Sequence, residues 1–237
     1  MAKLKKLGMT NKINLQNLTK SEEDYLKAIF QLLNDNEYDK VGNNLLADYL
    51  NVSPASTNNM IKKLKSKGYV LSQKYGKLDL TEHGKLIAVR LIRKHRLWET
   101  FLYNYLNFSW DEVHEVAEQL EHIKSHKLID ELDRFMKFPK RDPHGETIPS
   151  AEGEYVLTPK LTLSSLMEGQ FCQLIAVNDG SVNFLRYVSN IGLVLSSEIE
   201  ILEIREFDNS MRICFDNKEE TITKKFADNV FVKVIDK

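Results

Sequence analysis

A short segment in the middle of the chain carries two imidazoles and two carboxylates at helical spacing. It reads WDEVHEVAEQLEHIKSH, and its candidate metal ligands are His114, Glu118, Glu121 and His122. Because residues three, four and seven apart share one face of a helix, these side chains form a stripe over two turns. Imidazole nitrogen and carboxylate oxygen are common ligands of divalent metals. A solvated acidic face would explain the glutamates but not the histidines in register with them.

A second pair of the same types precedes this stripe. His95 and Glu99 in RKHRLWETF are spaced i, i+4 and share a helix face. Helices joined by a short loop usually pack antiparallel, which could bring the pair beside His114. A lone His–Glu pair is more often a helix-surface contact. We therefore expect this pair to bind metal only if it lies beside the first stripe.

Motifs for enzymatic chemistry are missing from the sequence. The run HEVAE nearly matches the zinc-protease pattern HExxH but has Glu118 in the place of the second histidine. The chain contains no P-loop, GxGxxG or GxSxG motif and no Cys–His nucleophile pair. We therefore expect that the protein is not an enzyme.

Charge divides the chain into two halves. The net charge is −1, but residues 1–100 hold 18 Lys and Arg against 10 Asp and Glu, whereas residues 101–237 hold 15 against 24. A basic half suits a polyanionic partner, and an acidic half gathers carboxylates.

The basic half contains a helix-turn-helix pattern. The segment SPASTNNMIKKLKSKG follows a short helix and a turn, and Gly68 ends it. Asn can bond an adenine edge, small residues let a helix lie deep in the major groove, and lysines contact phosphates, although lysines there also complement the helix dipole. The predicted DNA-binding residues are Ser53, Pro54, Ala55, Ser56, Asn58, Asn59, Lys62 and Lys63, with Lys74, Tyr75 and Lys77 at the tip of the hairpin that follows.

Periodicity predicts the elements that position these residues. We expect helices at 19–33, 45–50, 54–67, 81–105, 109–125 and 127–137, and a hairpin from 69–71 and 78–80. Beyond a Pro- and Gly-rich loop, the expected strands are FCQLIAV, NFLRYV, LVLSSEIEILEI, MRICF, ETITKKF and VFVKVI. The expected domains are a flexible basic tail (1–18), a winged helix-turn-helix (19–90), a helical metal-binding and dimerisation domain (91–141), a linker (142–160) and a small β-barrel (161–237).

No apolar run approaches the roughly 20 residues that span a bilayer, so we expect a cytoplasmic protein without a membrane partner. The two cysteines, Cys172 and Cys214, form no CxxC motif and lie in strand-like segments, so buried thiols are expected.

Several segments together resemble the diphtheria-toxin-repressor (DtxR/MntR) family, specifically its manganese-sensing branch with a C-terminal SH3-like (FeoA-like) domain. These segments are EDYLKAIF, SPASTNNMIKKL, LTEHG, RKHRLWE, EVHEVAEQLEH and the FPK..PHG..IP loop, and the resemblance covers nearly the whole chain after residue 19. It implies a mainly α fold with an SH3-like β-barrel. It also implies a homodimeric, metal-dependent repressor of metal-uptake genes that binds an inverted-repeat operator in double-stranded DNA.

The resemblance implies two ligand sets. The primary set is Asp24, Glu118, Glu121 and His122, and the second is His95, Glu99, His114 or His144, with Asp179 from the β domain. Asp24, His144 and Asp179 come from the resemblance alone. Two positions depart from the family pattern: Lys27 replaces a ligand glutamate of the short manganese sensors, and Asp142, which joins the candidate ligands, replaces a cysteine of close relatives.

Hard oxygen donors at Asp24 and Glu118, where iron-sensing relatives have Met and Cys, favour Mn(II), with Fe(II) as the second choice. Zn(II), Cd(II) and Co(II) are expected to bind in vitro. Two alternatives come from other classes of protein. One is a winged-helix regulator that responds to a small organic ligand, with a purely structural His/Glu stripe, and the other is a metal-storage or transport-accessory protein.

Overall fold

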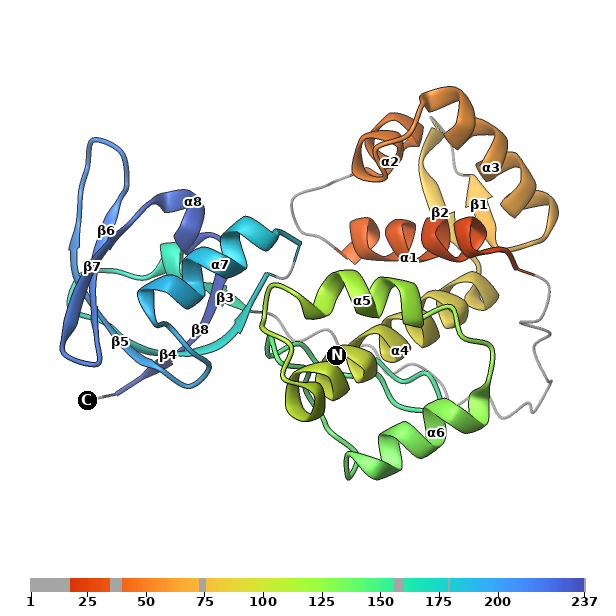
Figure 1. The fold of residues 1–237 in the computed structure, drawn as a ribbon. Coiled ribbons are helices and arrows are strands. Elements are labelled where there is room, and N and C mark those ends of the chain that lie inside the picture. Colours follow the sequence, from red (N-terminus) through yellow and green to blue (C-terminus); the bar gives the residue numbers. More distant parts are fainter. Residues whose placement is uncertain (1–17, 35–39, 73–75, 156–159, 179, 237) are drawn as a thin grey trace. The chain divides into compact units, whose positions relative to one another are not determined.

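The computed structural model describes residues 18–34, 40–72, 76–155, 160–178 and 180–236 (Figure 1). The chain forms two compact units, residues 1–87 and residues 88–237. Most of the expected basic tail, residues 1–17, lies outside the described part. Among the described residues, no helix is long and apolar enough to cross a membrane.

In the described residues before α4, the first unit combines three helices with a two-stranded hairpin. The elements are α1 (Lys20–Asn34), α2 (Asn43–Tyr49), α3 (Pro54–Ser66), β1 (Val70–Ser72) and β2 (Leu78–Leu80). Their shared core is made of fully buried aliphatic side chains, among them Leu26, Ile29, Leu46, Ile61 and Leu64. Because β1 pairs antiparallel with β2 directly after α3, the unit has the expected winged helix-turn-helix arrangement.

Local capping sets the bounds of α3. The Ser53 side chain accepts a hydrogen bond from the Ser56 amide (3.2 Å), and Pro54 occupies the first helical position. At the other end, Gly68 adopts a φ of +76°, which L side chains rarely reach. The predicted start and stop signals of this helix are therefore confirmed.

A buried ion pair joins α1 to the end of α3. Glu22 Oε1 lies 2.6 Å from Lys67 Nζ and 3.2 Å from Lys63 Nζ, and Glu22 Oε2 accepts from the Thr19 amide (2.9 Å). Burial alone would raise the pKa of Glu22, but the bonds from Lys67, Thr19 and Lys63 outweigh it and lower the pKa to about 2.

The second unit begins with helices that carry the metal-ligand stripe. Helix α4 (Glu82–Leu106) continues into it from the first unit, and α5 (Val113–Leu120) and α6 (His126–Phe135) follow. The helix expected at 109–125 is shorter than predicted. Ser109 donates from its hydroxyl to Asp111 and Glu112, which holds a turn before α5, and Glu121 is already the C-cap.

The C-terminal part of this unit is a six-stranded antiparallel sheet in the order β3-β8-β4-β5-β6-β7. The strands are β3 (Leu161–Thr162), β4 (Phe171–Val177), β5 (Glu198–Ile204), β6 (Met211–Phe215), β7 (Lys218–Ile222) and β8 (Val230–Ile235). A short 3-10 helix, η3 (Leu163–Ser165), and two helices, α7 (Val182–Ile191) and α8 (Lys224–Ala227), pack on the same core.

Three strand predictions in this part were wrong in whole or in part. NFLRYV is the helix α7, because Ser181 caps its start, Leu185 and Val188 are buried at helical spacing, and Gly192 ends it at a φ of +82°. The segment expected from Leu193 enters β5 only at Glu198, and the end of ETITKKF is α8, capped by Thr223. The β-branched and aromatic residues of these segments favour strands, but the capping residues Ser181 and Thr223 start helices there.

We expect Glu22→Gln to destabilise the first unit by about 1–3 kcal/mol at neutral pH, because it removes a charge-assisted bond to two lysines. Folding lowers the pKa of Glu22 from 4.5 to about 2, so this contribution is fully present above pH 4.5 and is lost as the pH falls toward 2. Denaturant unfolding at pH 7 and at pH 3 measures the difference. The exposed pair Glu82–Lys85 offers the control Glu82→Gln, with little expected effect. An equal loss at both pH values would contradict the assignment.

Candidate metal centre and DNA-binding surface

His95 of α4 contacts both Glu99 of its own helix and residues of the metal-ligand stripe. Its Nδ1 is 2.6 Å from Glu121 Oε2, and its Nε2 is 2.9 Å from Glu99 Oε1 and 3.2 Å from His114 Nδ1. Leu97 and Trp98 of α4 share a buried core with Ala117 of α5, so the two helices present these side chains to one another. The sequence-predicted meeting of His95 and Glu99 with His114 is thereby confirmed.

Glu99 is a fully buried carboxylate surrounded by imidazoles. His95 and His114 lie within 3.3 Å of its Oε1, and His144 Nδ1 lies 3.8 Å from its Oε2. Burial favours the neutral acid, yet the three histidines outweigh it and hold the pKa of Glu99 well below its usual range. Glu99 is therefore a candidate ligand that carries its negative charge in a desolvated position.

The Pro- and Gly-rich loop places two more candidate metal ligands, Asp142 and His144, next to Glu99. Asp142 Oδ1 accepts from the amides of His144 and Glu146, both at 2.9 Å, which closes a turn around the histidine. Arg96 of α4 secures this turn, since it donates to the Thr147 carbonyl and its Nε lies 3.4 Å from Asp142 Oδ2. The pKa of Arg96 is raised by Asp142, Tyr155 and Glu146 despite burial, so its charge is permanent.

Among the described residues of the second unit, the side chains form two groups that fit a divalent cation. In one group, His95, His114 and Glu118 each offer a ligand atom within 4.8 Å of the others, and in the other, fully buried group, Glu99, Asp142 and His144 do the same. Glu99 Oε2 is buried and accepts no hydrogen bond from the residues that the structure describes. Its 3.8 Å distance from His144 Nδ1 is too long for a hydrogen bond but suits two ligands of one cation.

The remaining predicted ligands are distributed as follows. Glu121 and His122 follow α5, with 3.8 Å between Glu121 Oε1 and His122 Nε2. Glu118 lies 3.6 Å from His114 Nε2 and so belongs with the histidines of the second predicted set. Asp24 is on α1 in the first unit. Asp179 lies outside the described residues.

Helix α3 presents the predicted DNA-binding side chains to solvent. The exposed positions are Ser53, Pro54, Ala55, Ser56, Asn58, Asn59, Lys62 and Lys63. Lys63 also pairs with Glu22, so its charge is shared with α1. At the hairpin, Lys77 is half-buried, and Lys74 and Tyr75 lie outside the described residues.

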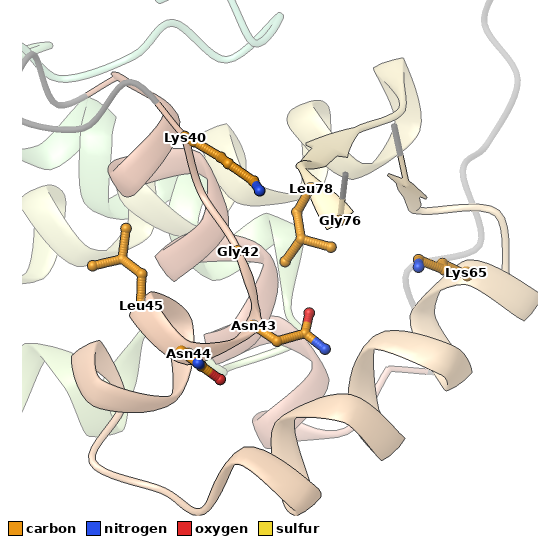
Figure 2. Close-up of a pocket in the computed structure, with 8 residues that line it drawn as sticks. All are labelled: Lys40, Gly42, Asn43, Asn44, Leu45, Lys65, Gly76 and Leu78. Carbon is orange, nitrogen blue, oxygen red and sulfur yellow. The ribbon is translucent and has the colours of Figure 1, made fainter. Parts of the chain in front are cut away.

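A polar groove lies between α2, the end of α3 and the hairpin. Its cavity volume is about 490 Å³, and Lys40, Asn43 and Lys65 reach toward it in Figure 2. Asn43 also donates to Asn58 of α3 (3.4 Å), which connects the groove with the exposed face of that helix. Two lysines and an asparagine at one groove suit contacts with a phosphate backbone. Lys40 and Asn43 were not predicted, although a lysine just before Val41–Gly42 and α2 was a visible signal.

Family models match three consecutive stretches of the chain. They are the iron dependent repressor N-terminal DNA-binding domain (residues 17–78), the iron dependent repressor metal binding and dimerisation domain (81–150) and the FeoA domain (161–234). An HTH-type transcriptional regulator MntR from Bacillus pumilus (strain SAFR-032) is 33% identical over 120 residues, which are 51% of this chain and 81% of that protein. The chain belongs to the diphtheria-toxin-repressor (DtxR/MntR) family. The family resemblance in the sequence is thus confirmed.

Solved structures of similar proteins extend the likeness over most of the chain. A manganese-dependent transcriptional repressor in complex with manganese is 34% identical, with a TM-score of 0.83, over 90% of this chain and all of that one. ScaR with bound Cd²⁺ is 33% identical, with a TM-score of 0.78, over 90% of this chain and 99% of that one.

Two residues at the metal centre escaped the sequence analysis. Arg96 lies within the RKHRLWE segment, but nothing in its spacing predicts that it secures the loop at Asp142. Trp110 contacts His144 across 34 residues of sequence, and only the folded chain brings them together. Contacts between a loop and a helix leave no period in the sequence.

We expect Glu99→Gln to weaken Mn(II) binding by at least about tenfold, because an anionic ligand becomes a neutral amide of the same shape. Isothermal titration calorimetry on the full chain measures the loss. Glu115→Gln, at an exposed position of α5, is the matched control. Unchanged affinity in Glu99→Gln would remove Glu99 from the ligand set.

Proposed function

We propose that this protein is a metal-dependent DNA-binding transcriptional repressor that responds to Mn(II). The observation that carries this conclusion is the buried Glu99 carboxylate with His144 and Asp142 around it, in a chain whose first unit is a winged helix-turn-helix. His95 and His114 contact Oε1 of this carboxylate, whereas Oε2 and His144 Nδ1 face each other at 3.8 Å, and a cation shared by these two atoms would compensate their burial.

The donor atoms support manganese as the physiological metal. Both groups consist only of carboxylate oxygen and imidazole nitrogen. Oxygen-rich sites suit Mn(II), whereas thiolates would select softer metals. Fe(II) is the second choice, and Zn(II), Cd(II) and Co(II) bind such ligands in vitro by the Irving–Williams order. Similar proteins have been solved with manganese, with Cd²⁺ and with Zn²⁺.

The switch would be a linkage between metal and DNA. Asp24 belongs to the unit that carries α3, whereas Glu118, Glu121 and His122 belong to the other unit. A metal bound by ligands of both units fixes one relative to the other, and its binding free energy then appears as DNA affinity, with the reciprocal effect required. His95 supports this set by its 2.6 Å contact with Glu121.

A second copy of the chain would complete the DNA-binding form. Aromatic side chains of α4 and α6 meet near the ends of these helices, where the exposed Tyr105 and Phe135 pack with ring centroids 5.0 Å apart. Other large apolar side chains exposed on or just beyond these helices are Tyr103, Leu106, Leu128 and Phe138. Apolar patches of this kind mark protein interfaces, and the matched domain is described as one for dimerisation. A two-fold dimer would place two copies of α3 on an inverted repeat upstream of metal-uptake genes.

The test of the function is a DNA-binding titration. We expect Mn(II) to increase affinity for promoter DNA of metal-transporter genes by at least about tenfold over a chelated control at fixed salt, since metal–DNA coupling is commonly 5–150-fold. Fluorescence anisotropy measures it, with Fe(II) and Zn(II) for comparison. Asp24→Ala and Glu121→Ala should lose the metal response while circular dichroism stays unchanged. Equal affinity under all conditions would refute the metal switch and favour an organic ligand.

The DNA-binding surface makes a separate prediction. Lys40→Ala combined with Lys65→Ala should make the slope of log affinity against log salt concentration shallower by about 0.9 per lost phosphate contact. It should weaken binding to all DNA sequences by the same factor. Asn59→Ala should instead relax sequence preference, at a cost of about 1–3 kcal/mol on the preferred site. Anisotropy at several salt concentrations separates the two effects. The exposed Lys218 of the β domain provides the control Lys218→Ala. An unchanged salt slope in the double variant would exclude the groove from the interface.

A further inference from the structure

Trp110 is a residue of the helical part that completes the core of the β domain. It lies in the connection between α4 and α5, yet its buried side chain belongs to the same apolar cluster as Leu163, Leu174 and Val230. A tryptophan buries about 150–250 Å² of surface, so this contact stabilises the docking of the β domain on the helical part.

The same residue fixes the ring of His144. The Trp110 carbonyl accepts a hydrogen bond from His144 Nε2 (3.1 Å), and the two rings lie 5.7 Å apart at 56°. Because a carbonyl only accepts, Nε2 carries the hydrogen and, in the neutral ring, Nδ1 keeps its lone pair. Nδ1 is the atom that faces Glu99 Oε2. Metal-binding histidines are commonly oriented in this way by a second partner.

Strand β4 holds the other side of His144. The Val177 amide donates to the His144 carbonyl (3.0 Å). A side chain on Gly145 would place its Cβ 2.1 Å from the Ile175 carbonyl oxygen, and Gly145 has a φ of +87°, so only glycine fits against the strand. The residue after Trp110 adds a further link, because Asp111 pairs with Arg186 of α7 at 2.6 Å.

We propose that Trp110 is a positioning residue that couples docking of the β domain to metal binding by Glu99, Asp142 and His144. While the indole fills the β-domain core, the Trp110 carbonyl and β4 hold His144 with Nδ1 toward Glu99. Undocking removes both supports at once, so metal and docking stabilise each other by linkage. This inference rests on the proposed function, since it requires that the cluster binds metal.

The test uses the full chain in a background with Asp24→Ala and Glu118→Ala, which removes ligands from the primary set and from the group of His95 and His114. Mn(II) calorimetry then reports the buried cluster, with hydrogen exchange of β4 amides as a second readout. We expect Trp110→Ala to weaken Mn(II) binding by about 10–100-fold. It should also abolish the metal-induced protection of Val177, whereas Trp110→Phe retains most of both. Arg186→Ala leaves the core intact and should lower both the Mn(II) affinity and the protection of Val177, by a smaller factor than Trp110→Ala. Arg205→Ala, an exposed arginine of the same domain, is the matched control.

The outcomes separate the two proposals. If wild-type protein binds no metal, the proposed function fails. If wild-type protein binds metal but Trp110→Ala and Arg186→Ala bind it with unchanged affinity and unchanged protection of Val177, the coupling is refuted and the function stands. Should Trp110→Ala unfold the β domain, seen as loss of protection in β6, Arg186→Ala alone decides: a change supports the coupling, and no change refutes it.

Discussion

Burial of the Glu99 carboxylate is the constraint on which the metal centre depends. An ionised carboxylate removed from water is costly unless charges or hydrogen bonds compensate it. Here His95 and His114 supply that compensation at Oε1 while His144 faces Oε2, and each histidine is held by a different element: α4, α5 and the loop after α6. The packing of Leu97 and Trp98 on Ala117, and the turn closed by Asp142, are therefore conditions for a charged Glu99.

A chain of contacts in the second unit supports the residues around this charge. Arg96 neutralises Asp142 and holds the loop, Asp142 orients the amide of His144, and Trp110 and β4 hold its ring and carbonyl. Each of these contacts involves a buried or backbone partner, which suits ligands that must be in place before the metal binds. The β domain thus contacts His144 directly, through the Val177 amide, and indirectly, through Trp110.

Local signals in the sequence were sufficient for the DNA-binding unit and insufficient for the loop. Ser53, Pro54 and Gly68 fix the bounds of α3 by backbone chemistry that any reader of the sequence can recognise. The same kind of signal, Ser181 and Gly192 around α7, was outweighed by β-branched and aromatic residues in the prediction. The helical ligands followed from periodicity, whereas the contact of His144 with Trp110 depends on tertiary folding and has no periodic trace.

The absence of sulfur from the ligand groups has a consequence for oxidative stress. The chain has only two cysteines, Cys172 and Cys214, and both lie in strands of the β domain. Burial raises the pKa of the Cys172 thiol to about 12, which keeps it protonated and unreactive. Peroxide converts a thiolate ligand to a sulfenic acid, which releases the metal. A carboxylate such as Asp142 does not undergo this reaction. A sensor whose ligands are carboxylates and imidazoles therefore keeps its metal-binding groups intact during exposure to peroxide.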